Sequence, residues 1–85
     1  MNVKLYIGNL SKSTTQEELS ALFAQAGEVT LTDIIADRDS GESKGYAFVT
    51  MSTQNEAEKA IHMFNTYSVM GRELKVAMAK PIRNL

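Results

Sequence analysis

The sequence predicts an α+β domain in which two amphipathic helices cover one face of a four-stranded antiparallel sheet. Four short segments alternate between apolar and other residues, which is the period of half-buried strands. Two further segments repeat apolar residues at helical spacing. Their order along the chain is strand, helix, strand, strand, helix, strand. Packing both helices against the same sheet face buries both apolar stripes, so the order predicts this sandwich.

The first strand is predicted at residues 3–7. Its aliphatic side chains share one face and are Val3, Leu5 and Ile7. A core beneath that face would bury them, which leaves Lys4 and Tyr6 on the opposite face. Gly8 and Asn9 then end the alternation, as expected at the start of a loop.

A helix is predicted after this loop, ending at Gly27. Three hydroxyl side chains offer N-cap oxygens, and they are Ser13, Thr14 and Thr15. Glu17 and Glu18 place negative charge in the first turn, where the helix dipole favours it. One apolar stripe follows at positions i, i+3, i+4 and i+7, formed by Leu19, Leu22, Phe23 and Ala26.

A β-hairpin is predicted next. Residues 30–36 are rich in β-branched side chains, which favours a second strand. Residues 37–43 are polar and charged, which favours a turn. The returning arm is residues 44–51, KGYAFVTM, and this segment is apolar on both of its faces.

A second helix and a fourth strand complete the predicted sandwich. Residues 52–55 supply N-cap side chains. The apolar stripe of this helix consists of Ala57, Ala60, Ile61 and Phe64. After Gly71, residues 72–78 are predicted as a strand that buries Leu74 and Val76.

Length and composition indicate one small globular domain. The chain has 85 residues, of which 44% are hydrophobic and 22% charged. We expect a ferredoxin-like βαββαβ domain over residues 1–80 and a short tail over residues 81–85. Cysteine is absent, and no apolar run has the length of a membrane span. We therefore expect a cytoplasmic protein, or a nuclear one in a eukaryote.

The uncovered sheet face is predicted to be a binding surface. Alternation places on it Lys4, Tyr6, Lys44, Tyr46, Phe48, Thr50, Lys75, Ala77 and Ala79. Three of these residues are aromatic, and exposed rings clustered on neighbouring strands mark an interaction site. Bases of single-stranded nucleic acid stack on such rings while lysine ammonium groups contact phosphates.

The net charge of −1 argues mildly against a nucleic-acid partner, because phosphate binders are commonly basic. The charges are segregated, however. The open face carries Lys4, Lys44 and Lys75. The predicted helices carry Glu17, Glu18, Glu56 and Glu58. Asp33 is the expected exception on the open face, where it should repel phosphate. A platform with few cations predicts binding that is weaker and less salt-dependent than that of a strongly basic domain.

With these residues in place, the chain resembles the RNA recognition motif family over nearly its whole length. Residues 44–51 are similar to the family's octamer at every position except the last, Met51, which alternation directs into the core. Residues 5–10, LYIGNL, are similar to the companion hexamer. Among relatives, the chain looks most like small single-motif proteins of bacteria and cyanobacteria and the RNA-binding half of plant glycine-rich proteins.

The resemblance implies roles for the matching positions. Tyr6 and Tyr46 would stack successive bases, Phe48 would pack against a base or between sugars, and Lys44 would pair with a phosphate. The last strand would help set base preference through Lys75, Ala77 and Ala79. Asn9 and the 37–43 loop would frame the site, with Lys4 and Thr50 on the same face.

These observations lead us to expect a monomeric, non-enzymatic protein that binds single-stranded RNA in a post-transcriptional role. No cofactor or metal is expected, because the single histidine, His62, has no second imidazole or acidic cluster near it in the sequence. Single-stranded DNA is an alternative ligand, since stacking does not require the 2′-hydroxyl. A protein-interaction module is a second alternative, including a form in which the tail covers Tyr46 and Phe48.

Overall fold

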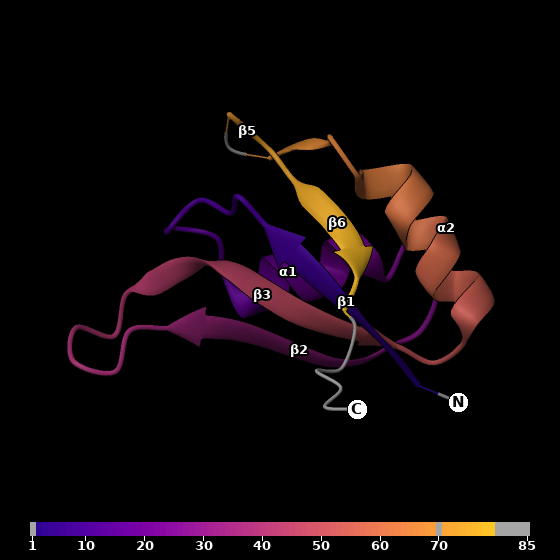
Figure 1. Cartoon of the computed structure of the whole chain (residues 1–85), viewed down its shortest axis with the longest axis horizontal. Coiled ribbons are helices and arrows are strands. Elements are labelled where there is room, and N and C mark those ends of the chain that lie inside the picture. Colours follow the sequence, from indigo (N-terminus) through magenta and orange to yellow (C-terminus); the bar gives the residue numbers. More distant parts are fainter. Residues whose placement is uncertain (1, 70, 80–85) are drawn as a thin grey trace, which may run out of the picture.

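The computed structural model describes residues 2–69 and 71–79 and confirms the ferredoxin-like βαββαβ sandwich (Figure 1). The antiparallel sheet contains β1 (Val3–Gly8), β2 (Val29–Ala36), β3 (Ser43–Met51) and β6 (Lys75–Met78), in the order β2-β3-β1-β6. Helices α1 (Gln16–Phe23) and α2 (Gln54–Phe64) pack on one face of it. The predicted tail and the boundary at residue 80 lie outside the described residues.

The core fills the space between the helices and the sheet. From the strands it takes the side chains that alternation predicted to point inward, including Leu5, Ile7, Val49 and Met51, all fully buried. The two helices meet through Phe23 and Phe64, whose ring centroids are 4.9 Å apart. Met51, the departure from the octamer, is therefore a packing residue, as the sequence predicted.

Helix α1 begins as the sequence predicts and ends earlier. Thr15 is the N-cap, and it forms a capping box with Glu18. The helix ends at Phe23, and its last i→i−4 hydrogen bond runs from Ala24 N–H to Ser20 O at 2.9 Å. The following residues form tighter i→i−3 turns, such as Ala26 N–H to Phe23 O at 3.0 Å. Gly27 thus does not cap the helix. Its role is close approach, since a Cβ there would lie 2.5 Å from Cγ of Glu56.

The predicted fourth strand is broken at Leu74. Two short strands, β4 (Ser68–Val69) and β5 (Arg72–Glu73), form a separate hairpin that the sequence analysis missed. Leu74 is buried, and its N–H and C=O pair with Tyr67 and Thr66 at 2.9 and 2.8 Å. Its backbone therefore bonds to the segment after α2, which divides β5 from β6. Segments of two residues are too short to show an alternating pattern.

Candidate nucleic-acid interface

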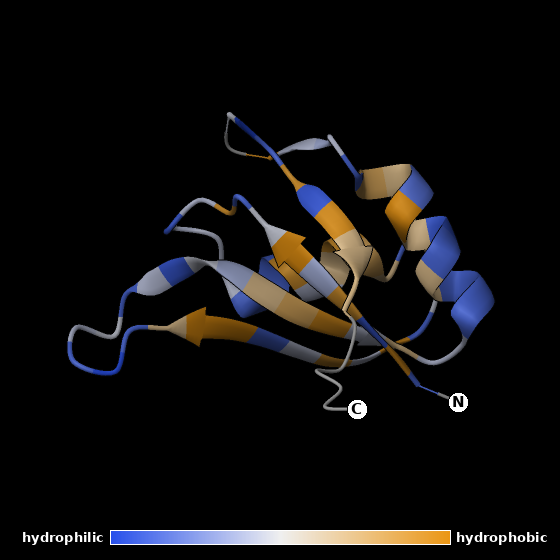
Figure 2. Cartoon of the chain, in the orientation of Figure 1, coloured by the Kyte–Doolittle hydropathy of each residue, from blue (hydrophilic) through white to orange (hydrophobic). Residues whose placement is uncertain are grey.

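The face of the sheet opposite the helices carries a row of neighbouring side chains that crosses all four strands. In register, Asp33 of β2 lies opposite Phe48 of β3, Phe48 opposite Tyr6 of β1, and Tyr6 opposite Ala77 of β6. Figure 2 shows that each strand mixes hydrophobic and hydrophilic residues, whereas the loop between β2 and β3 is strongly hydrophilic. The register places the octamer ring of Phe48 beside the hexamer ring of Tyr6 on this surface.

Three aromatic rings form a compact triangle on this face. The Tyr6 centroid lies 6.0 Å from that of Tyr46 and 6.0 Å from that of Phe48, and Tyr46 and Phe48 are 6.1 Å apart. The interplanar angles are 33°, 62° and 86°, so the rings contact one another mainly by tilted and edge-to-face packing. Tyr6 is 38% exposed, and the other two rings are partly exposed. Ring surface therefore remains available for a planar ligand.

Two glycines shape this surface. Gly8 is buried, and a Cβ on it would lie 2.7 Å from the hydroxyl oxygen of Tyr6, so the Tyr6 ring extends over Gly8. Gly45 has a φ of +90°, which a side chain would strain. Its carbonyl accepts a hydrogen bond from Leu10 N–H at 2.9 Å, which joins the octamer to the segment after β1. Glycine is therefore favoured at both positions, at Gly8 by the ring above it and at Gly45 by its positive φ.

Cations lie around the rings. The Nζ of Lys4 is 5.3 Å from the Phe48 ring centroid, a cation–π distance. Lys44 and Lys75 are exposed. None of these three ammonium groups forms an ion pair within residues 2–69 and 71–79, so all three can contact phosphate. Thr50 lies beside Lys4 in register, and Ala79 donates its N–H to the Lys4 carbonyl at 3.0 Å.

Asn9 is held by internal contacts at the end of β1. Its Nδ2 donates to the Glu73 carbonyl at 2.8 Å, and its Oδ1 accepts from Nη1 of Arg72 at 3.1 Å. Its φ is +61°, a left-handed conformation that asparagine tolerates better than most residues. The amide thus joins β1 to the β4–β5 hairpin. The expectation that Asn9 frames a bound nucleic acid stays a prediction.

The loop between β2 and β3 is an ordered turn beside Tyr46. Oδ1 of Asp37 accepts from the N–H groups of Asp39 and Ser40 at 2.8 and 3.1 Å, and these bonds lower the pKa of Asp37, most through Ser40. An open depression of about 570 Å³ separates the loop from Lys12, with Lys44 and Tyr46 also in its lining. Lys12 was not predicted from the sequence, because it follows β1 in a segment without a recognisable pattern.

Leu31 is a second residue of the open face that the sequence analysis missed. It is 57% exposed and lies opposite Thr50. A β-bulge precedes it, since Val29 pairs with Met51 and Thr30 is the extra residue. Strand alternation could have identified it, because Leu31 is two residues from Asp33 and therefore shares its face.

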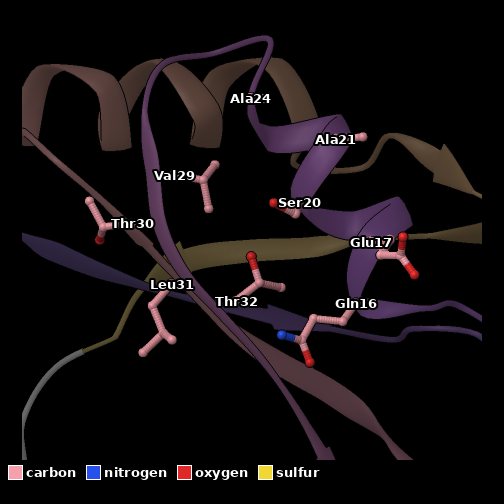
Figure 3. Close-up of a pocket in the computed structure, with 9 residues that line it drawn as sticks. All are labelled: Gln16, Glu17, Ser20, Ala21, Ala24, Val29, Thr30, Leu31 and Thr32. Atoms are coloured by element: carbon pink, nitrogen blue, oxygen red, sulfur yellow. The ribbon is translucent and has the colours of Figure 1, made fainter.

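A different depression, of about 780 Å³, lies between α1 and β2 at the edge of the sheet (Figure 3). Its lining is mainly small or polar, with Glu17 as the charged side chain. The Thr32 hydroxyl is buried beside it without a hydrogen-bond partner in the described structure. This depression lacks the rings and lysines that the open face brings together.

Other kinds of site are not assembled in the described residues. Between residues 2 and 79, with residue 70 excepted, His, Cys, Asp and Glu form no group of three that could hold a metal ion. His62 is an exposed residue of α2, remote from the open face. Over the same residues no helix has the length and hydrophobicity needed to cross a membrane.

Comparison with known proteins decides the family. A model of the RNA recognition motif matches residues 5–75, which includes both sequence motifs and most of the four-stranded sheet. The chain belongs to the RNA recognition motif family. The narrower likeness to small single-motif bacterial or glycine-rich plant proteins stays a prediction.

Two curated relatives of this RNA recognition motif are plant proteins. One is RNA-binding protein CP31B, chloroplastic, of Arabidopsis thaliana, 47% identical over 78 residues that cover 92% of this chain and 27% of that protein. Another is the 31 kDa ribonucleoprotein, chloroplastic, of Nicotiana sylvestris, 49% identical over 78 residues that cover 92% of this chain and 25% of that protein. The chain thus spans about a quarter of their length.

A solved structure of similar fold is that of a Sex-lethal protein/RNA complex. Its TM-score to this RNA recognition motif is 0.91, at 34% identity, covering 98% of this chain and 50% of that chain.

The expected location is corrected by these relatives. Both are named as chloroplast proteins, which contradicts the prediction of a cytoplasmic or nuclear protein. The prediction was wrong because it relied on the absence of cysteine and of an apolar span. Those features are compatible with any reducing compartment and do not distinguish one from another.

Proposed function

We propose that this chain binds short single-stranded RNA on the open face of its sheet. The observation that carries the proposal is the triangle of Tyr6, Tyr46 and Phe48, three rings with centroids 6.0 to 6.1 Å apart on adjacent strands. Tyr6 and Tyr46 stack successive bases, and Phe48 packs against a base or between sugars. Stacking of this kind contributes about 1–3 kcal/mol per base.

Lysines supply the contacts to the RNA backbone in this proposal. Lys44 pairs with a phosphate beside Tyr46, and Lys4 and Lys75 contact the backbone on either side of the rings. Each neutralised phosphate of single-stranded RNA adds about −0.7 to the slope of log affinity against log salt concentration. Three contacts therefore give a slope of about −2, which is modest for a nucleic-acid-binding protein.

Edge contacts complete the proposed site. Thr50, Ala77 and Ala79 border the rings and limit which base edges fit, while Asn9 and the loop after β2 bound the surface at one end. The role is binding without catalysis, in the handling of transcripts. It is supported by family membership and by relatives that are named as RNA-binding proteins and ribonucleoproteins.

The test is binding of a labelled, randomised single-stranded RNA pool to the wild type and to a Tyr46→Ala, Phe48→Ala double variant at two salt concentrations. The proposal expects the double variant to lose most of the affinity. Tyr67→Ala is the matched control, because Tyr67 is also an exposed aromatic residue, at 47%, but contacts Phe64 of α2 instead of the open face. Equal binding by all three proteins would reject the proposed surface.

Two rival ligands are tested in the same experiment. A DNA pool of the same length measures whether the 2′-hydroxyl contributes, since stacking alone would retain DNA binding. A protein partner on this surface becomes the better explanation if the wild type binds neither pool. Sedimentation of the free chain tests the expected monomer.

A further inference from the structure

Asp33 lies among the rings and lysines of the open face. It is exposed, and it sits directly opposite Phe48 in the register of β2 and β3. It is the one carboxylate within β1, β2, β3 and β6. Its carboxylate forms no hydrogen bond or ion pair with the residues that the structure describes. A surface suited to phosphate therefore includes an unpaired negative charge.

The surroundings of Phe48 differ on its two sides. Toward β1, Lys4 places its Nζ 5.3 Å from the ring centroid. Toward β2, the neighbours are the Asp33 carboxylate and, two residues earlier, the exposed side chain of Leu31. A nucleotide stacked on Phe48 would place its phosphate toward Lys4, because the carboxylate repels phosphate. Its base edge would then face Asp33.

A carboxylate is a selective partner for a base edge. It accepts hydrogen bonds through two oxygens and donates none when ionised. Guanine presents two adjacent donors on its Watson–Crick edge, N1–H and the N2 amino group, which match both oxygens. Adenine and cytosine present an amino group next to a ring-nitrogen acceptor. Uracil presents its N3–H between two carbonyl oxygens, and both repel a carboxylate.

We propose that Asp33 makes the Phe48 position of the RNA surface selective for guanine. The inference rests on the proposed RNA binding at this face and adds the base preference of one position. Hydrogen bonds to an ionised carboxylate are stronger than neutral ones, and RNA recognition commonly uses the Watson–Crick edges of unpaired bases. A bidentate contact of this kind discriminates by about tenfold or more against the wrong base.

The competing explanation is that Asp33 acts only through repulsion of the RNA backbone. Repulsion weakens all RNAs by a similar factor, because every sequence carries the same phosphates. A hydrogen-bonding role changes the ratio between sequences. The two explanations therefore predict different results for a variant that removes the charge and keeps the shape.

The test measures the affinity of four heptamers, each a uridine strand with G, A, C or U at its centre, for three proteins. The proteins are the wild type, Asp33→Asn, and Glu58→Gln. The last removes one negative charge from an exposed residue of α2, on the other side of the molecule. The uridine background lets the strand slide until the preferred base occupies the Phe48 position. Circular dichroism checks that all three proteins are folded.

The proposal expects the wild type and Glu58→Gln to bind the G heptamer about tenfold tighter than the U heptamer, and Asp33→Asn to lose most of that ratio. Wild-type binding of all four heptamers without preference for G would overturn the proposal and leave RNA binding at the face intact. An equal gain in affinity for all four RNAs in Asp33→Asn would also overturn it. If the wild type binds no heptamer, the proposed RNA binding fails together with the proposed preference for guanine.

Discussion

The two faces of the sheet are built from alternate residues of the same strands, yet they are stabilised in opposite ways. On the helix-covered face, Leu5 and Val49 are fully buried and contribute to one continuous core. On the open face, their chain neighbours Tyr6 and Phe48 keep part of their rings in solvent. Apolar surface left in water contributes nothing to folding, so its presence on one face indicates a ligand.

Stability and RNA binding therefore depend on different residues of the same strands, those that face the helices and those that face solvent. A substitution on the covered face should change the free energy of unfolding and leave the binding surface of the folded molecules intact. A substitution on the open face should do the reverse. Four experiments test this separation, in order of the size of the expected effect.

Leu5→Ala should produce the largest effect, on stability. Leu5 is fully buried, and truncating such a side chain costs about 2–5 kcal/mol in transfer free energy and cavity formation. The total free energy of unfolding of a small domain is about 5–15 kcal/mol, so the variant should unfold at a much lower urea concentration. Urea denaturation followed by circular dichroism measures this. A loss below about 1 kcal/mol would contradict the burial argument.

Tyr6→Ala should affect binding more than stability. The ring stacks a base in the proposed function, so its loss should weaken RNA binding by about 1–3 kcal/mol, or roughly 5- to 150-fold. The unfolding free energy should change by less than in Leu5→Ala, because Tyr6 is partly solvated already. Fluorescence anisotropy and urea denaturation on one preparation give both values. A stability loss as large as that of Leu5→Ala, with RNA affinity unchanged, would show that Tyr6 belongs to the core and not to a binding surface.

Gly8→Ala should move the Tyr6 ring without removing it. The added Cβ would lie 2.7 Å from the Tyr6 hydroxyl oxygen, so the ring must shift. We expect a smaller loss of RNA affinity than for Tyr6→Ala. In the Tyr6→Ala background the same substitution should have little further effect, because there is no ring left to displace. Equal losses in both backgrounds would show that Gly8 acts independently of Tyr6.

Acid should destabilise the protein slightly through Glu56, which lies on the helix side. Hydrogen bonds from the Ser52 hydroxyl and, second, from Glu28 N–H lower the pKa of Glu56. A lowered folded-state pKa gives stability that is present above the ordinary carboxyl pKa and is lost as pH falls through the lowered value. Asp37 follows the same direction.

The measurement is the urea midpoint of the wild type and Glu56→Gln between about pH 7 and pH 3. The urea midpoint of the wild type should decrease as pH falls, and that of the variant should decrease less. RNA affinity near neutral pH should be equal for the two proteins. Identical pH profiles of the midpoint would show that these hydrogen bonds add no stability.

Alternation predicted most of the fold and the centre of the candidate site, because parity depends only on the strand period. Tyr6 and Phe48 were assigned to the open face from sequence, and the register places them side by side. The β4–β5 hairpin was missed because two-residue strands carry no pattern. The end of α1 was misplaced because Gly27 is required by contact with Glu56, which is 29 positions further on and invisible to local rules.

The rest of the site depends on long-range geometry that the sequence does not show. Lys12 and the loop after β2 line the same depression, although they are far apart in the sequence. The hydrogen bonds of the Asn9 amide to Arg72 and Glu73 join residues more than 60 positions apart. The exposure of Leu31 could have been predicted, because strand alternation assigns it to the same face as Asp33. Only Asp33 was assigned to that face, because of its charge.

RNA binding at the open face is tested most directly by titrating the isotope-labelled chain with short single-stranded RNA and following its NMR spectrum. We expect the largest shifts on the rings of Tyr6, Tyr46 and Phe48 and on the neighbouring amides of β1 and β3. Amides of α1 and α2 should change little. Shifts concentrated on the helices, or in the depression between α1 and β2, with the three rings unperturbed, would contradict RNA binding at the open face.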